Sequence, residues 1–145
     1  MVIQMANEPK TLVETAVARL LEKDYDLLRR DVNEKAITAK LASYLAPLFS
    51  GWDVDSEYNR NLEEVKKLAW KKPGIFDLVV PDIIIHKRGT EKNFLVIEVK
   101  KTEKQNRGND RKKLVAFKEQ LGYENALFLT FSTKEQPFRA EYEWV

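Results

Sequence analysis

The chain contains two apolar stretches that carry charges in their interiors, VVPDIII at residues 79–85 and FLVIEVK at residues 94–100. Both have the composition of buried β-strands. Side chains alternate between the two faces of a strand, so Glu98 and Lys100 are expected on one face, opposite Ile97. Because a buried charge costs free energy unless it is paired or bound to a metal, these charges require a partner or a ligand.

A polar segment, KRGTEK at residues 87–92, joins the two stretches and is typical of a hairpin connection. If the hairpin is symmetric about Thr90, Asp82 lies directly opposite Glu98. Opposed side chains in such a pair are about 4.5–5.5 Å apart. Lys100 shares the face of Glu98, so we expect two carboxylates and one ammonium group to converge.

Paired carboxylates of this kind suit a hard divalent cation such as Mg²⁺ or Mn²⁺. Mg²⁺ is commonly held by one or two carboxylates together with water and substrate phosphate. A lysine beside the ion can orient the attacking water or neutralise a phosphate oxygen. The pattern therefore predicts phosphodiester hydrolysis.

The residues Pro81-Asp82 and Glu98-Val99-Lys100 match the motif of the PD-(D/E)xK superfamily, the restriction-endonuclease-like phosphodiesterases, and the chain resembles that superfamily. The resemblance implies an α/β fold with a restriction-endonuclease-like mixed central sheet flanked by helices. It also implies that Asp82, Glu98 and the carbonyl of Val99 hold the metal. Lys100 then acts on the water or the phosphate.

The resemblance covers about residues 31–131. The segments NEKA at 33–36 and EYNR at 57–60 are, in addition, similar to a group of small, uncharacterised bacterial proteins of that superfamily. Many members place a further metal-binding glutamate on the helix before the first core strand, which implies Glu34. Glu34 lies three residues before Ile37 and is expected on the same helical face. Alternatively, Glu34 is a first-turn acid stabilised by the helix dipole.

The length and composition of the chain limit the fold and the kinds of metal site. The 145 residues predict a single domain, 1–145, and the chain contains no cysteine and one histidine. Thiolate sites and multi-histidine zinc sites are excluded, so a metal must be held by oxygen. The mean hydropathy is −0.48, and neither a long apolar run nor a signal peptide is found, so we expect a cytoplasmic protein without membrane contact.

Positive charge is concentrated in one part of the chain. Residues 60–118 contain 16 Lys or Arg against 8 Asp or Glu, although the whole chain carries a net charge of only +2. This distribution favours a nucleic acid, with DNA as the expected partner, although lysines also solvate loops and helices without binding anything. The predicted contacts are Lys66, Lys67, Lys71 and Lys72.

The remaining segments predict alternating helices and strands. A capping box at Thr11 predicts the first helix, and the apolar spacing between Asn33 and Gly51 predicts a second. The other expected elements are a strand at 52–58 exposed on one side, a basic helix at 62–70, a helix capped by Asp110 that ends before Gly122, a strand at 126–129 and an edge strand at 138–144.

Other charged groups on these elements are interpreted without catalytic roles. His86 is expected to be a partly exposed structural residue near the turn, outside the site. Asp53, Asp55 and Glu57 are expected to form a solvated acidic face of their strand.

Three functions remain open from the sequence. The first is a metal-dependent endo- or exonuclease, which as a homodimer could cut both strands of a duplex. The second is a catalytically silent nucleic-acid-binding module of the same fold. The third is a protein-interaction domain in which the hairpin charges form a structural ion pair.

Overall fold

A computed structural model describes residues 8–29, 34–56, 66–68, 77–79, 81–101, 107–132 and 138–145, with backbone only for 66–68, 77–79 and 107–109. The helices in these ranges are α1 (Pro9–Lys23), α2 (Tyr25–Arg29), α3 (Glu34–Leu45) and α4 (Arg107–Leu121). The strands are β1 (Asp53–Ser56), β2 (Lys66–Leu68), β3 (Asp77–Val79), β4 (Ile83–His86), β5 (Asn93–Lys101), β6 (Asn125–Ser132) and β7 (Arg139–Trp144).

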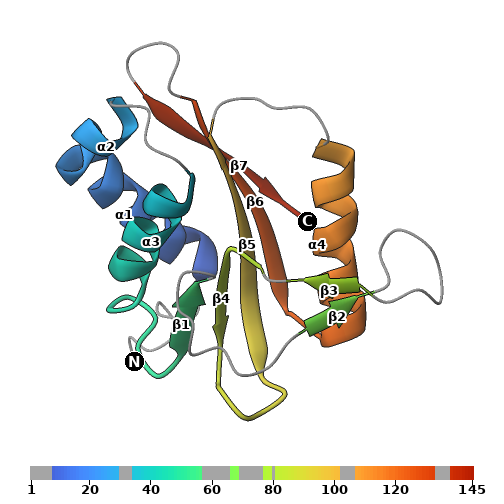
Figure 1. The fold of residues 1–145 in the computed structure, drawn as a ribbon. Coiled ribbons are helices and arrows are strands. Elements are labelled where there is room, and N and C mark those ends of the chain that lie inside the picture. Colours follow the sequence, from blue (N-terminus) through green and yellow to red (C-terminus); the bar gives the residue numbers. More distant parts are fainter. Residues whose placement is uncertain are drawn as a thin grey trace.

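Five strands form a mixed sheet in the order β1-β4-β5-β6-β7 (Figure 1). β5 and β6 are parallel and the other neighbours are antiparallel. Helix α4 is the crossover between the two parallel strands, because a tight turn cannot join parallel neighbours. β2 and β3 form a separate two-stranded sheet beside α4. The expected mixed α/β class and the edge position of β7 are confirmed.

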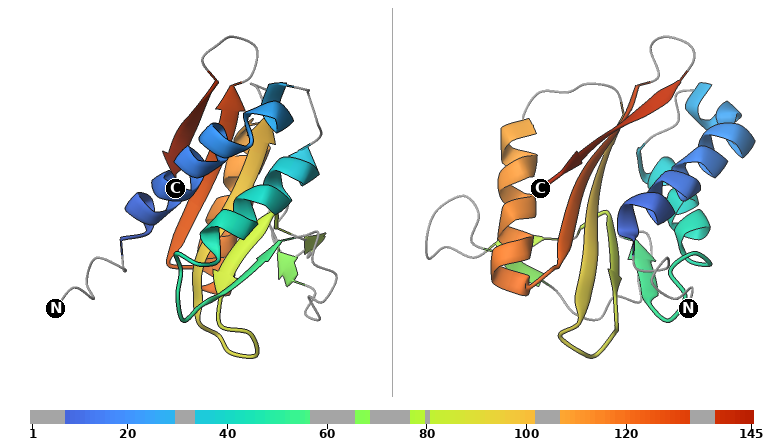
Figure 2. Two further views of the ribbon diagram at one scale, coloured as in Figure 1. Left: turned by 90° about the vertical axis from the view of Figure 1, so that its left-hand side faces the viewer. Right: turned by 180° about the vertical axis from the view of Figure 1, so that it is seen from behind.

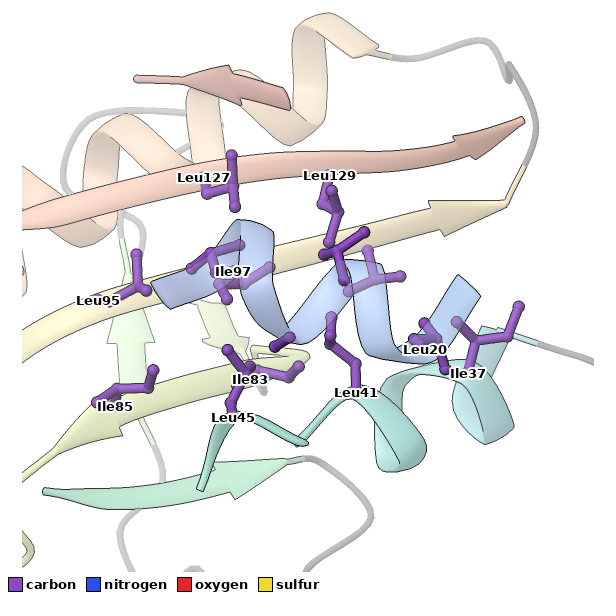
Figure 3. Close-up of a cluster of buried hydrophobic side chains, with 14 of the residues drawn as sticks. Leu20, Ile37, Leu41, Leu45, Ile83, Ile85, Leu95, Ile97, Leu127 and Leu129 are labelled. Atoms are coloured by element: carbon purple, nitrogen blue, oxygen red, sulfur yellow. The ribbon is translucent and has the colours of Figure 1, made fainter. Parts of the chain in front are cut away.

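Helices cover both faces of the five-stranded sheet. α1 and α3 lie on one face and α4 lies on the other (Figure 2). The four residues of β4 are all buried, which explains its uninterrupted apolar run. Figure 3 shows the cluster beneath α1 and α3, which includes Leu20, Ile37, Leu41, Leu45, Ile83, Ile85, Leu95, Ile97, Leu127 and Leu129. The cluster beneath α4 includes Ile84, Val96, Leu114, Phe117, Ala126 and Phe128.

The β4–β5 hairpin has the predicted register. Ile83 pairs with Ile97, so the position before Ile83 lies opposite Glu98. A register shift after Ile85 departs from the expected symmetry near the turn. Gly89 adopts a positive φ of 74°, a conformation in which glycine avoids steric strain.

The apolar stretch at residues 79–85 is not one strand, which corrects the sequence prediction. Val79 ends β3, and β4 begins only at Ile83. Pro81 lies between them, and proline has no N–H to donate to a sheet ladder. The chain therefore leaves the small sheet at Val79 and enters the five-stranded sheet at Ile83, directly after Asp82.

Other predicted element boundaries were wrong. Residues 66–68 form β2 and not part of a basic helix. Thr11 lies inside α1, whose N-cap is Glu8 and whose first turn contains Pro9, a residue with a φ suited to that position. Asp110 lies inside α4 and does not cap it. Asn33, the expected cap of α3, lies outside the described residues.

In the described part of the chain, no helix is long and apolar enough to cross a membrane.

Candidate active site

Asp82 and Glu98 meet at the point where β4 begins. The backbone N–H of Asp82 donates a hydrogen bond of 3.3 Å to Oε2 of Glu98. Oδ2 of Asp82 accepts a hydrogen bond of 2.7 Å from the backbone N–H of Val99. The two carboxylates are thus held by main-chain groups on opposing segments of the hairpin.

Glu34 reaches the same edge of β5 from the first residue of α3. Its Oε2 accepts a hydrogen bond of 3.0 Å from the backbone N–H of Lys101. The N–H groups of Val99 and Lys101 point to the same side of the strand and are about 7 Å apart, at about 3.3 Å per residue. The carbonyl of Val99 faces this edge as well, because a strand residue directs its N–H and C=O to one side.

The charges beside Glu98 and Lys100 come from α4. Nζ of Lys113 lies 3.4 Å from Oε1 of Glu98, and Nζ of Lys100 lies 3.8 Å from Oδ2 of Asp110. Glu98 and Lys100 share one face of β5, as the alternation predicts, and each is paired with α4 instead of with the other. Sequence analysis missed Lys113. Its spacing of three residues from Asp110, which places both on one helical face, was the available signal.

Glu98 is the most deeply buried of these charged groups. The residue is 3% exposed. Burial raises the pKa of Glu98 above its ordinary value of 4.5, the ammonium of Lys113 and the N–H of Asp82 act in the opposite direction, and the charge of Asp110 adds to the increase. A buried carboxylate of this kind is stabilised by a cation close to it.

The oxygen atoms at this edge are of the type that a magnesium or manganese ion binds. Mg²⁺ prefers oxygen and often uses one or two protein carboxylates, completing its shell with water and phosphate. Asp82 and Glu98 supply two carboxylates, and Val99 supplies a carbonyl at the same edge. The described residues contain no group of three His, Cys, Asp or Glu side chains that could hold a metal by themselves.

The predicted nucleic-acid contacts are only partly described. Lys66 and Lys67 belong to β2, where they pair with Val79 and Leu78 of β3. Their backbone lies beside α4, on the face of the sheet that carries Glu98. Lys71, Lys72 and the segment 57–60 lie outside the described residues.

A second charged cluster corrects the expectation of a solvated acidic face on β1. Asp55 is 1% exposed and binds both His86 and Arg88. Nε2 of His86 lies 2.8 Å from Oδ2 of Asp55, and Nε of Arg88 donates to the same oxygen at 2.9 Å. His86 is therefore buried, and not partly exposed as predicted. Asp53 accepts the backbone N–H of Arg88 at 3.0 Å.

This second cluster connects β1 to the end of β4 and to the turn that follows it. Burial alone raises the pKa of Asp55, but the hydrogen bonds and charges of Arg88 and His86 outweigh it and hold that pKa below its ordinary value. The ionised carboxylate fastens the start of the β4–β5 turn to β1. Ile84 lies opposite Asp55 and separates it from Asp82 along the same face, so the cluster is not part of the candidate site.

A polar hollow of about 490 Å³ lies at the other end of β5. It is lined by Thr90, Glu91 and Asn93 from the hairpin and by residues 119–122 at the end of α4. No predicted site residue lines it, so this hollow is separate from the candidate site.

Comparisons of the chain with known protein families, with curated proteins and with solved structures find no match.

Proposed function

We propose that the protein is a metal-dependent nuclease that hydrolyses phosphodiester bonds in DNA, with a restriction-endonuclease-like fold. The observation that carries this proposal is the main-chain fixing of Asp82 and Glu98 at one edge of β5. Two preoriented carboxylates beside a strand carbonyl form an oxygen-rich site suited to Mg²⁺ or Mn²⁺. The elements α3, β1, the β4–β5 hairpin, α4 and β6 follow the order helix, strand, hairpin, helix, strand, which the resemblance implies for the nuclease core.

Each residue has a defined role in this proposal. Asp82, Glu98 and the carbonyl of Val99 hold the metal. Glu34, whose carboxylate accepts the N–H of Lys101, would have to turn toward them to supply a further carboxylate from α3. A bound divalent ion activates water and stabilises charge on the phosphate. Lys100, whose side chain is 30% exposed, orients the water or neutralises a phosphate oxygen. Asp110 positions the Lys100 ammonium from α4.

The basic segment, residues 66–72, is proposed to bind the nucleic acid. Lys66, Lys67, Lys71 and Lys72 are proposed to contact backbone phosphates, because counterion release favours such contacts whatever the base sequence. The location of β2 beside α4 supports this assignment, since it brings the backbone of Lys66 and Lys67 to the face of the sheet that carries Glu98.

A structural role for the same charges is the second candidate. Glu98 and Lys113 form one ion pair and Lys100 and Asp110 form another, both between β5 and α4. Such pairs could fasten α4 to the sheet in a protein-interaction domain. A nucleic-acid-binding module without turnover would use the basic segment and leave the carboxylates idle.

A cleavage assay separates these functions. Labelled single- and double-stranded DNA and RNA would be incubated with the protein in Mg²⁺, in Mn²⁺ and in chelator. We expect divalent-dependent cleavage of DNA, its loss in Asp82→Asn, and its retention in Asp53→Asn, an isosteric control on β1. Salt-sensitive binding without cleavage would indicate the silent module, and neither binding nor cleavage would indicate the structural role.

A further inference from the structure

Lys113 lies at the boundary between the buried carboxylate of Glu98 and the solvent. Its Nζ is 3.4 Å from Oε1 of Glu98, and the two side chains are 21% and 4% exposed respectively. Lys112, the preceding residue on α4, is exposed. The ammonium of Lys113 therefore has a buried partner on one side and a route to water on the other.

Both oxygens of Glu98 already have partners. Oε1 faces Lys113, and Oε2 accepts the N–H of Asp82. Carboxylate oxygens bind Mg²⁺ at about 2.0–2.1 Å, and like charges in a poorly solvated site repel strongly. A divalent ion bound to Oε1 would compete with the ammonium of Lys113 for that oxygen and repel it.

We propose that Lys113 is a displaceable counter-ion, which leaves Glu98 when a divalent cation binds there and then contacts a phosphate of the nucleic acid. This inference rests on the proposed function and adds a regulatory step to it. Asp110 faces Lys100 through Oδ2, so the released ammonium would compete with Lys100 for that carboxylate. The flexible stem of lysine allows the ammonium to move without a change in the backbone of α4.

The net charge of the site gives a reason for replacing the Lys113 ammonium by a divalent cation. The carboxylates of Asp82, Glu98, Glu34 and Asp110 and the ammonium groups of Lys100 and Lys113 leave two net negative charges when all are ionised. One divalent cation balances them. Without the metal the site repels phosphate, and with it the released Lys113 adds a positive contact. Nucleic-acid binding and metal binding are thereby coupled.

The test measures how DNA affinity depends on salt, with and without metal. Lys113→Met and the matched control Lys112→Met would be compared with wild type on a phosphorothioate duplex, which keeps its backbone charge and resists hydrolysis. Titrations would be run in Mn²⁺ and in chelator. In chelator, wild type and Lys113→Met should show equal slopes of log affinity against log salt. In Mn²⁺, the slope of Lys113→Met should be smaller by about 0.9, the value for one phosphate contact.

The controls separate phosphate contact from a structural role. Any effect of Lys112→Met should be the same in both conditions, and Lys113→Arg should keep the wild-type slope in Mn²⁺. Calorimetry without DNA should show that Lys113→Met binds Mn²⁺ at least as tightly as wild type, because a competing cation is gone. Weaker Mn²⁺ binding by a folded Lys113→Met would show that Lys113 merely positions Glu98, and would overturn the inference.

Failure of this inference differs from failure of the proposed function. Wild type that binds no Mn²⁺, or no DNA, overturns both. The role of Lys113 alone is overturned by a different result. In that result wild type binds Mn²⁺ and cleaves DNA, but the difference in salt slope between wild type and Lys113→Met is the same in Mn²⁺ and in chelator, or is absent in both. If Lys113→Met does not fold, Lys113→Gln provides the same comparison.

Discussion

The backbone N–H of Asp82 donates a hydrogen bond to Oε2 of Glu98 at 3.3 Å, at the position where β4 begins opposite β5. The side chain of Asp82 in turn accepts the N–H of Val99 at 2.7 Å. A carboxylate held by main-chain donors keeps its orientation with little loss of side-chain entropy when a ligand binds. The positions of the Asp82 and Glu98 carboxylates are therefore fixed by the hairpin before any ligand binds.

Divalent metal should stabilise the wild-type protein. A ligand that binds only the folded state contributes about 2.7 kcal/mol at 100 times its Kd. We expect Mg²⁺ or Mn²⁺ to raise Tm in wild type but not in Asp82→Ala, as measured by thermal unfolding. Equal divalent binding in calorimetry by wild type and the Asp82→Ala, Glu98→Ala double variant would remove the site as described.

Lys100→Ala should abolish cleavage while leaving folding and metal binding nearly intact. The Lys100–Asp110 pair is partly exposed at 3.8 Å, so its loss should cost no more than about 1 kcal/mol. Urea unfolding in chelator and Mn²⁺ calorimetry would measure both effects. A wild type that cleaves neither DNA nor RNA in Mg²⁺ or Mn²⁺ would defeat the nuclease proposal, whatever the stability of Lys100→Ala.

Nucleic-acid binding should weaken log-linearly with salt. Each phosphate contact contributes a slope of about −0.9 on duplex DNA, because a bound counterion is released. Replacing Lys66, Lys67, Lys71 and Lys72 together by Gln should reduce the magnitude of the slope by up to about 3.6 if all four contact phosphates. Fluorescence anisotropy between about 50 and 200 mM salt would measure it. An unchanged slope would show that the basic segment does not touch DNA.

Asp55→Ala should destabilise the fold by about 1–3 kcal/mol, because the buried ring of His86 loses its hydrogen-bond partner, whereas the exposed side chain of Arg88 can be solvated. Asp53→Ala, on the same strand, should have a much smaller effect. The pKa of Asp55 is lowered in the folded state, so its stabilising contribution is present above the ordinary value of 3.8 and is lost as the pH falls through the lowered pKa. Urea unfolding of both variants across acidic pH would check the sign.

Glu98 should have the opposite pH dependence in metal-free protein. Its pKa is raised by burial, so the unfolded chain loses this proton at a lower pH than the folded chain. Stability should therefore fall as the pH rises from the ordinary value of 4.5 through the raised pKa. Glu98→Gln cannot titrate and should lack this fall. The free energy of unfolding of both proteins would be measured by urea at each pH, and the difference between the two values isolates the effect of Glu98. A difference that does not change with pH would contradict the prediction.

The sequence by itself determined the hairpin and its pairing. Turn residues around Gly89 and the alternation of side chains in a strand are local properties, and they were sufficient to place Asp82 opposite Glu98 and Lys100 on the face of Glu98. The apolar spacing around Ile37 likewise located α3. The mixed α/β class follows from the same periodic patterns.

Tertiary structure alone decided which charges meet and which are buried. Lys113 becomes the neighbour of Glu98 only because α4 crosses over from β5 to β6 and packs on that face of the sheet. Asp55 is buried and contacts His86 and Arg88 of the hairpin, whereas alternation along β1 alone suggested a solvated face. Local patterns assign residues to faces, but burial and ion pairing depend on what the rest of the chain packs against each face.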